Sequence, residues 1–305
     1  GRECGGDDPG ECGAAHTVLH GAAARHTTPA AAVKANGKQE TGDRNQGTRA
    51  GGAGYAGRAI PILSPVSCFP SPAPRCPMPT PTLAELAKMF DHSLLQPHLT
   101  DADLEKGCAL AAEYKVASVC IKPYAVPLAA KLLAGTGVFV STTIGFPHGG
   151  HLTKVKVFES EAAIAGGAVE LDMVVNISKV LSGDWDYVAA DVSAVIAAAH
   201  RRGAKVKVIF ENALLKDDHK KKLCEICGAA GADWVKTSTG YAETGATIED
   251  LKLMRAFSPP AVQVKAAGGV RSFDTLMAVR EVGVTRVGAT ATKAILDDAK
   301  ARLGL

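Results

Sequence analysis

From about residue 83 onward, short apolar runs alternate with longer segments in which apolar residues recur every three or four positions. The longer segments have the period of helices that bury one face, and the short runs are typical of buried strands. Eight such runs predict strands at residues 89–94, 118–121, 138–144, 170–175, 205–210, 233–237, 262–266 and 286–288. Helices are predicted at residues 103–114, 154–165, 185–200, 217–230, 248–257 and 272–282.

Helix-capping signals support these assignments, because Thr100, Thr247 and Ser272 precede helical segments and can accept backbone N–H groups there. Strict alternation of strands and helices implies parallel strands joined by right-handed crossovers, and eight repeats over about 215 residues fit a closed (β/α)8 barrel. An open doubly wound sheet is the alternative fold, but no G-x-G-x-x-G follows the first strand. We therefore expect an α/β chain of the TIM barrel class.

Residues 1–77 are different in character: they are rich in Gly, Ala, Pro and Thr and contain only two aromatic residues, Tyr55 and Phe69. A segment of this composition cannot bury enough apolar surface to offset its ordering entropy, so we expect a disordered extension. Met78 is the first methionine. We place the domain boundary there, with residues 78–305 as the barrel. A transit peptide is the weaker interpretation, because acidic residues are present and Arg does not dominate.

The 305-residue chain is 47% hydrophobic and carries a formal net charge of +3, enough apolar residues for one large core. Residues 1–77 hold eight Lys and Arg against six Asp and Glu, leaving 26 against 25 in residues 78–305. A nearly neutral barrel argues against a nucleic-acid or membrane-surface partner, which would need a broad basic face. No apolar run approaches the roughly 18 residues of a membrane span.

The eight cysteines have no repeating spacing, so they do not form a disulfide framework. Cys224 and Cys227 make a C-x-x-C, but it falls inside the predicted helix at 217–230, without a second Cys or His pair at ligand spacing. We interpret this pair as helix packing rather than a metal or redox site. No metal-binding residues are predicted.

Candidate chemistry gathers where strands end, because barrel enzymes place their reacting residues at the carboxyl ends of the strands. Lys236 lies in the sixth strand at the same alternation parity as Trp234. A lysine buried among apolar neighbours loses its charge more readily and becomes a nucleophile for carbonyls. The structural alternative is a strand-end lysine whose ammonium extends to solvent.

Lys265 occupies the corresponding place in the next strand, and adjacent strands lie about 4.8 Å apart. Two inward ammonium groups repel each other, which further favours loss of a proton from Lys236. Asp172, within the apolar fourth strand, needs a buried partner such as an inward lysine. Asp172 either relays protons with Lys265 or forms a structural ion pair. Glu170 and Glu211 are weaker candidates for an acid.

Glycines after the last two strands suggest an anion site. Gly268 and Gly269 precede the helix that Ser272 caps, and Gly288 and Thr290 precede the last helix. In barrels these two loops commonly hold a phosphate through backbone N–H groups and the helix dipole. The structural alternative is that the glycines only form tight turns.

Over residues 85–300 the sequence resembles the deoxyribose-phosphate aldolase family. The matching stretches are FDHSLL (90–95), ASVCI (117–121), TIGFP (143–147), ELDMV (170–174), SGDW (182–185), VKTSTG (235–240) and VKAAGGVR (264–271). The resemblance implies a class I aldolase that reversibly cleaves 2-deoxy-D-ribose 5-phosphate to acetaldehyde and D-glyceraldehyde 3-phosphate, without a cofactor or metal. It also implies a cytoplasmic enzyme of deoxyribose phosphate catabolism whose partners are phosphosugar and aldehyde substrates, as a homodimer or homotetramer.

The same resemblance implies roles for individual residues. Lys236 forms the Schiff base, while Lys265 and Asp172 tune it and move protons. Asp91 and Cys120, expected at the ends of the first and second strands, line the pocket, while plain core packing is the structural alternative for Cys120. The residues implied in binding substrate and phosphate are Thr239, Gly240, Gly268, Gly269, Val270, Arg271, Gly288 and Thr290.

The sequence departs from the family in three places. Some members end in a tyrosine thought to assist proton transfer, whereas residues 301–305 read ARLGL. The last loop reads GATAT (288–292), and FEN (210–212) replaces a more common Glu-Thr. Substrate preference is the property these changes leave open. A transaldolase-like or larger-sugar aldolase, and a non-catalytic phosphosugar-binding barrel, are the competing interpretations.

Overall fold

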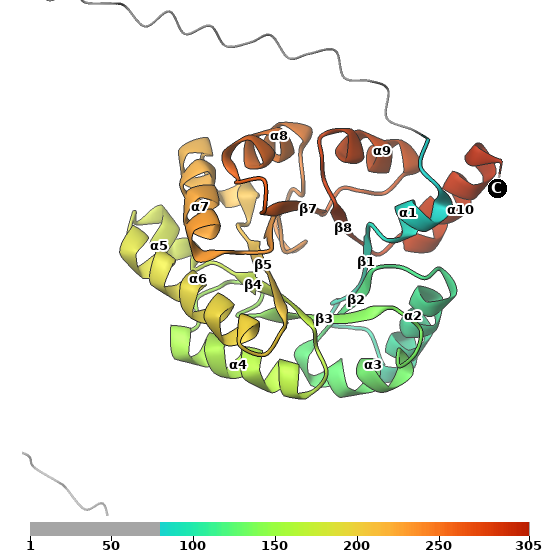
Figure 1. Cartoon of the computed structure of the whole chain (residues 1–305), viewed down its shortest axis with the longest axis horizontal. Helices are drawn as coiled ribbons and strands as arrows, with labels where there is room; N and C mark the ends of the chain where they lie inside the picture. Colours follow the sequence, from blue (N-terminus) through green and yellow to red (C-terminus); the bar gives the residue numbers. More distant parts are fainter. Residues whose placement is uncertain (1–79, 305) are drawn as a thin grey trace, which may run out of the picture. The chain divides into compact units, whose positions relative to one another are not determined.

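Eight parallel strands close into a barrel in the computed structural model, which describes residues 80–304 (Figure 1). The strands are β1 Phe90–Leu94, β2 Ser118–Ile121, β3 Phe139–Ile144, β4 Glu170–Val174, β5 Lys205–Ile209, β6 Trp234–Lys236, β7 Gln263–Ala267 and β8 Arg286–Ala289. Each strand pairs with the next, and β8 pairs with β1 to close the barrel. The predicted TIM barrel is confirmed. The boundary predicted at Met78 and the disordered extension predicted for residues 1–77 lie outside the described residues.

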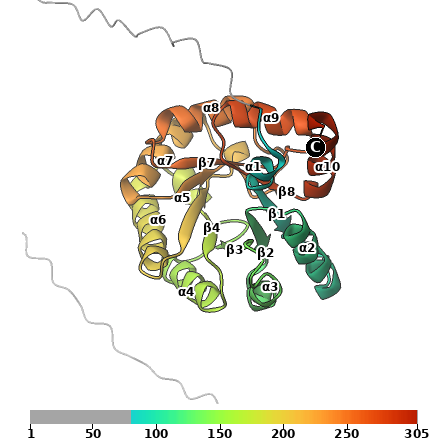
Figure 2. The same cartoon turned by 45° about the vertical axis from the view of Figure 1, so that its right-hand side comes forward.

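Helices surround the strands on the outside (Figures 1 and 2). They are α1 Leu83–Ala87, α2 Asp101–Glu113, α3 Val126–Leu132, α4 Thr153–Ala165, α5 Ile177–Leu181, α6 Trp185–His200, α7 Asp217–Ala230, α8 Ile248–Phe257, α9 Phe273–Glu281 and α10 Thr292–Leu303, with short 3-10 turns η1 Pro123–Ala125 and η2 Asn212–Leu214. The predicted strands and helices agree with these bounds to within two residues at each end. The short helices α1, α3 and α5 have no counterpart among the predicted segments, and α10 was expected after Thr290 without predicted bounds.

The three predicted helix caps are confirmed. Thr100 forms a capping box with Asp103 at the start of α2. Thr247 accepts a backbone N–H at the start of α8, and Ser272 does so at the start of α9. Each cap satisfies a donor that the first helical turn leaves unpaired and so determines where the helix begins.

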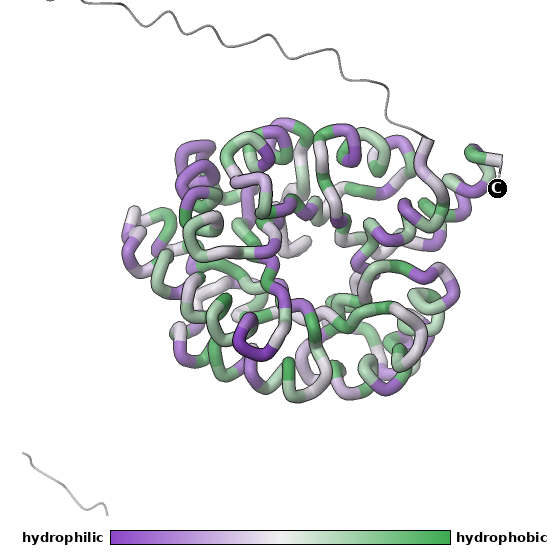
Figure 3. The backbone as a smooth tube through the Cα atoms, in the orientation of Figure 1, coloured by the Kyte–Doolittle hydropathy of each residue, from purple (hydrophilic) through white to green (hydrophobic). Residues whose placement is uncertain are grey.

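The core lies between the strands and the helices. Along each strand, side chains alternate between the helices and the barrel interior. Leu171, Val206 and Val235 belong to the apolar core and are fully buried. The neighbouring positions in the same strands carry charged side chains that meet inside the barrel. The outer helices alternate hydrophilic and hydrophobic segments along their length, as expected where one face packs on the strands (Figure 3).

Cys224 and Cys227 are buried in α7, where burial raises the pKa of both thiols. The Cys224 Sγ lies 3.8 Å from the carbonyl of Met254 in α8, so this cysteine packs between two helices as predicted. Within residues 80–304, no helix has both the length and the apolar character needed to cross a membrane.

Candidate active site

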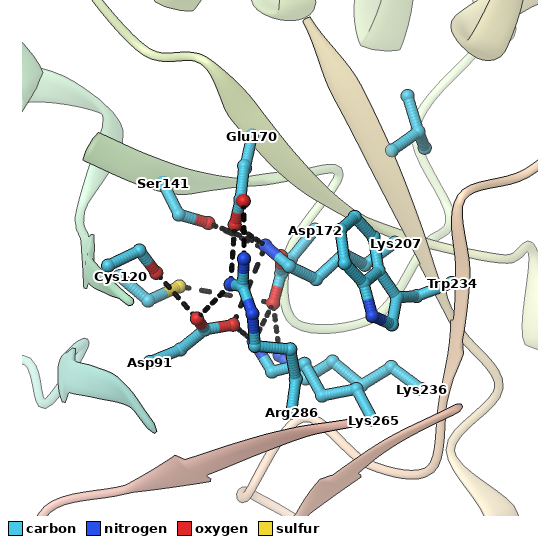
Figure 4. A network of polar contacts seen from close by, with 12 residues as sticks. Asp91, Cys120, Ser141, Glu170, Asp172, Lys207, Trp234, Lys236, Lys265 and Arg286 are labelled. Atoms are coloured by element: carbon cyan, nitrogen blue, oxygen red, sulfur yellow. Dashed lines mark hydrogen bonds and ion pairs between the residues drawn. The ribbon is translucent and has the colours of Figure 1, made fainter. Parts of the chain in front are cut away.

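Seven charged side chains from six strands converge inside the barrel (Figure 4). They are Asp91, Glu170, Asp172, Lys207, Lys236, Lys265 and Arg286. All seven are buried, with Arg286 the most exposed at 9%. Charges removed from water to this degree must be paired, and the pairing determines which of them keep their protons.

Asp172 is the centre of this network. Its Oδ2 lies 2.7 Å from the Nζ of Lys236 and 2.7 Å from the Nζ of Lys265. Its Oδ1 lies 2.8 Å from the Nζ of Lys207 and accepts a hydrogen bond from the Ser141 hydroxyl at 3.3 Å. The carboxylate therefore pairs with three lysine ammonium groups at once.

The remaining contacts tie the network to the other strands. Arg286 donates to both oxygens of Glu170, at 2.8 and 2.9 Å, and also contacts Asp91. The Nζ of Lys207 lies 2.7 Å from Glu170 and 3.5 Å from Asp91. The Nζ of Lys265 lies 2.6 Å from Asp91. Consequently Lys207, Lys265 and Arg286 each contact at least two carboxylates.

Lys236 differs from the other three cations in this respect. Among the described residues its ion pair is with Asp172 alone. Four basic groups share three carboxylates, so the network is electrically neutral only if one basic group gives up its proton. The group with the fewest carboxylate contacts loses the least electrostatic stabilisation when it gives up its proton. Lys236 is that group.

The pKa shifts follow the same division. Burial lowers the pKa of Lys236; Asp172 opposes this and Lys265 adds to it, and the net pKa lies below the ordinary lysine value. Burial would also lower the pKa of Lys265, but Asp172 and Asp91 raise it above that value. Lys207 and Arg286 likewise have raised pKa values, because their carboxylates outweigh the cost of burial. Burial raises the pKa of Asp172, yet Lys207, Lys236 and Lys265 hold it well below its usual range.

Lys236 and Lys265 line a cavity of about 350 Å³ at the carboxyl ends of the strands. Its walls include every residue predicted to bind substrate or phosphate: Asp91, Cys120, Thr239, Gly240, Gly268, Gly269, Val270, Arg271, Gly288 and Thr290. Asp172 is fully buried beneath them. Cys120 places its Sγ 4.0 Å from Asp172, and burial raises the pKa of its thiol.

One placement needs correction. Asp91 was expected at the end of the first strand, but it is the second residue of β1 and contacts Arg286 and Lys265 in the barrel interior. The pattern of residues 89–94 predicted a strand but did not show that Asp91 lies near its beginning rather than its end. Glu211, a weaker acid candidate, does not line this cavity; its carboxylate accepts hydrogen bonds from the amide and hydroxyl of Thr239.

The loops after β7 and β8 present backbone to the cavity. Gly268 and Gly269 have φ values of +72° and +91°, a region that disfavours residues with a Cβ. A Cβ on Gly268 would also lie 2.9 Å from the Cα of Gly245 in the preceding loop. Because α9 begins just after this loop, its unpaired N–H groups add to an anion-binding geometry.

Two members of the network, Lys207 and Arg286, were missed as candidates. Lys207 has the signal that singled out Lys236, namely a lysine within an apolar strand. Arg286 is the first residue of the shortest predicted strand, where an inward orientation could not be read from alternation. Their partner Glu170 was considered only as an acid, and the structure shows it paired with both.

Comparisons with known proteins agree with this geometry. Residues 85–294 match the family model described as DeoC/LacD family aldolase. The chain is 57% identical over 221 residues to the deoxyribose-phosphate aldolase of Rhodopirellula baltica, covering 72% of this chain and 92% of that protein. It is 45% identical over 218 residues to the enzyme of the same name from Thermococcus gammatolerans, covering 71% and 97%.

Among solved structures, the chain is similar to the tetrameric deoxyribose phosphate aldolase of Aeropyrum pernix, with a TM-score of 0.68 and 30% identity, covering 72% of this chain and 93% of that one. The family model covers more than half of this chain, and its matched residues contain the whole charged network. This chain belongs to the DeoC/LacD family of aldolases.

Proposed function

We propose that the chain is a class I aldolase that reversibly cleaves 2-deoxy-D-ribose 5-phosphate to acetaldehyde and D-glyceraldehyde 3-phosphate. The observation that supports this most is the pairing of Lys236. It is the basic group with the fewest carboxylate contacts in the described network, its pKa is lowered, and it faces the cavity. A neutral amine in such a place can attack an aldehyde carbon. The identity of the substrate is inferred from the relatives that are named deoxyribose-phosphate aldolase.

In the synthetic direction the Nζ of Lys236 adds to the carbonyl carbon of acetaldehyde, and loss of water gives an iminium ion. The positive nitrogen acidifies the methyl protons, and transfer of one proton to a carrier, Asp172 with Lys265 or a bound water, gives an enamine. The enamine carbon attacks the aldehyde carbon of glyceraldehyde 3-phosphate and forms the new carbon–carbon bond, and the aldehyde oxygen takes up the carried proton and becomes a hydroxyl group. Water then hydrolyses the iminium and releases Lys236 as an amine. Cleavage is the reverse of this sequence.

Lys265 and Asp172 have different roles in the reaction, as a proton donor and as a hydrogen-bond acceptor. Lys265 keeps its proton, because its pKa is raised, and can deliver it to the oxygen that leaves as water. Asp172 is ionised and can accept a hydrogen bond from the protonated Schiff base, since its Oδ2 already lies 2.7 Å from Lys236 Nζ. Proton transfer by groups positioned in this way contributes about 10²–10⁴ to the rate.

The phosphate of the substrate would bind at the loops after β7 and β8. Gly268, Gly269, Arg271, Gly288 and Thr290 line that end of the cavity. Backbone N–H groups, a hydroxyl and a guanidinium are the donors that these residues could offer to a phosphate. Thr290 retains a hydroxyl where the family usually has serine, so the departure in this loop preserves the donor. Arg271 supplies the positive charge.

We further propose that the protein acts in deoxyribose phosphate catabolism in the cytoplasm, as a homodimer or homotetramer. The similarity to the tetrameric Aeropyrum pernix aldolase supports self-association. Light scattering on the purified chain distinguishes these assemblies from a monomer.

Assays of purified protein test the proposed reaction. Release of acetaldehyde from deoxyribose 5-phosphate is expected, with much slower cleavage of fructose phosphates and no loss of activity after treatment with a chelator. Preferred cleavage of fructose phosphates would support the larger-sugar aldolase instead. Binding of deoxyribose 5-phosphate without turnover would support the non-catalytic barrel.

A further inference from the structure

A second cavity lies beside the first at the mouth of the barrel. Its volume is about 410 Å³, within the range of small-molecule sites. The first cavity is lined mainly by the loops after β1, β6, β7 and β8, and the second by the loops after β3, β4, β5 and β6. Two residues line both cavities, Thr239 and Tyr241.

Tyr241 is held in place from three sides. Its hydroxyl donates to the carbonyl of Leu95 at 2.9 Å, in the loop after β1. Its ring meets that of Phe146, after β3, edge to face at 5.5 Å between centroids. Its amide donates to the hydroxyl of Thr239 at 3.1 Å. A side chain from the β6 loop that reaches the loops after β1 and β3 crosses the mouth of the barrel.

The second cavity suits an uncharged chain rather than an anion. Two carboxylates, Glu211 and Glu243, line it together with one imidazole, His148, and none of the described Lys or Arg residues does. Its remaining walls include the apolar side chains of Ile177, Leu214 and Ala213. A phosphate would be repelled here, whereas a short hydrocarbon chain would replace water against apolar surface.

Lys236 stands on β6, between these two environments. On the side of β7 lie the loops proposed to bind phosphate, and on the side of β5 lies the second cavity. We propose that Tyr241 is the residue that restricts the aldehyde donor to a short one, by closing the second cavity to the chain of a longer aldehyde bound at Lys236. This inference rests on the proposed aldolase function.

The chemistry is the same for a longer donor. Its aldehyde carbon forms the iminium with Lys236, its α-carbon loses a proton and bonds to the carbonyl carbon of glyceraldehyde 3-phosphate, and water releases the product. No oxidant or other reactant is required. Only the space available to the substituent on the α-carbon distinguishes pentanal from acetaldehyde.

The experiment measures kcat/KM for pentanal relative to acetaldehyde in addition to D-glyceraldehyde 3-phosphate. Tyr241→Ala is expected to raise this ratio at least about tenfold, since a few methylene groups in a new apolar site are worth that much. Tyr241→Phe keeps the ring and should leave the ratio near that of the unmodified chain. Tyr124→Ala is the matched control, because Tyr124 is 65% exposed and lines neither cavity.

A second substitution tests whether the gain depends on the second cavity. Ala213 lines that cavity and not the first, so Ala213→Phe added to Tyr241→Ala should return the ratio towards its original value. An unchanged ratio in Tyr241→Ala, or a gain that Ala213→Phe does not reverse, overturns the inference. Tyr241→Leu replaces Tyr241→Ala if the latter does not fold. Failure of the unmodified chain to add acetaldehyde would instead overturn the proposed function.

Discussion

Lys236 and Lys265 are direct partners in the register of β6 and β7, and their Nζ atoms each lie 2.7 Å from the same oxygen of Asp172. Lys265 has a second carboxylate, Asp91, at 2.6 Å, and Lys236 has none within residues 80–304. This asymmetry between otherwise equivalent neighbours explains why the pKa is raised in one and lowered in the other.

Replacing Lys265 should change the pH dependence of Schiff-base formation. The reactive form of Lys236 is neutral, so the rate rises as pH increases through its pKa. Burial lowers that pKa most, Asp172 raises it, and Lys265 lowers it further. In Lys265→Met the part of the lowering that Lys265 supplies is lost, while burial and Asp172 remain, so the pKa of Lys236 rises and the profile moves to higher pH. Single-turnover rates with acetaldehyde across pH measure this. No shift, or a shift to lower pH, would contradict the role of Lys265.

Lys207→Met should destabilise the fold. The Nζ of Lys207 contacts Asp91, Glu170 and Asp172, and removing it leaves buried carboxylates with one cation fewer. Breaking a buried pair in this way costs about 3–5 kcal/mol. Urea unfolding of the unmodified chain and of Lys207→Met measures this difference in the free energy of unfolding. Lys205→Met is the matched control two residues earlier in β5, where the side chain is exposed and the expected loss is below about 1 kcal/mol. Equal losses would show that the network does not depend on Lys207.

Arg271→Leu should weaken binding of phosphorylated substrate selectively. Arg271 lines the end of the cavity where phosphate is proposed to bind. Loss of a charged hydrogen bond costs about 1.5–3 kcal/mol, so kcat/KM for deoxyribose 5-phosphate should fall roughly tenfold to a hundredfold. The value for unphosphorylated deoxyribose should hardly change. Arg201→Leu, at the exposed end of α6, serves as the control. Equal losses with both sugars would place the phosphate elsewhere.

His92 should make stability depend on pH. Burial lowers the pKa of His92 from its ordinary value of 6.5 to about 4, and its Nδ1 lies 2.9 Å from the hydroxyl of Thr292. The unfolded chain therefore binds a proton at higher pH than the folded one. The contribution of His92 to the free energy of unfolding is fully present above pH 6.5. It declines by about 3 kcal/mol as the pH falls towards 4.

Urea unfolding between pH 7 and pH 4 measures this decline, and His92→Asn should reduce its slope by the contribution of one proton. The carboxylates of the network also lose stability in acid, but their lowered pKa values place that loss at lower pH. An unchanged slope in His92→Asn would mean that His92 does not titrate in this range.

The periodicity of the chain was sufficient to predict the barrel, because all eight strands and most of the crossover helices carry their own apolar pattern, although α3 between β2 and β3 did not. It was also sufficient to pair Lys236 with Lys265, since equivalent positions in adjacent parallel strands are neighbours. The apolar fourth strand around Asp172 predicted that this carboxylate would need a buried partner such as an inward lysine, and the structure pairs it with Lys207, Lys236 and Lys265. The predicted caps at Thr100, Thr247 and Ser272 depend only on local contacts.

What could not be predicted depends on the closure of the barrel. Arg286 in β8 reaches Glu170 in β4 across the interior, and no local pattern relates residues separated by 116 positions. The role of Lys207 as a competitor for Asp172 became visible only with the distances. The placement of Tyr241 across the mouth depends on three loops at once.

Reductive trapping tests the central claim most directly. The protein is incubated with acetaldehyde and borohydride, digested, and mapped by mass spectrometry. We expect an ethyl group on the peptide that contains Lys236, and loss of that label together with turnover in Lys236→Met, whose fold should be unchanged by circular dichroism. Stable labelling of Lys265 or Lys207 in place of Lys236, or no adduct in a chain that cleaves deoxyribose 5-phosphate, would contradict a Schiff base at Lys236.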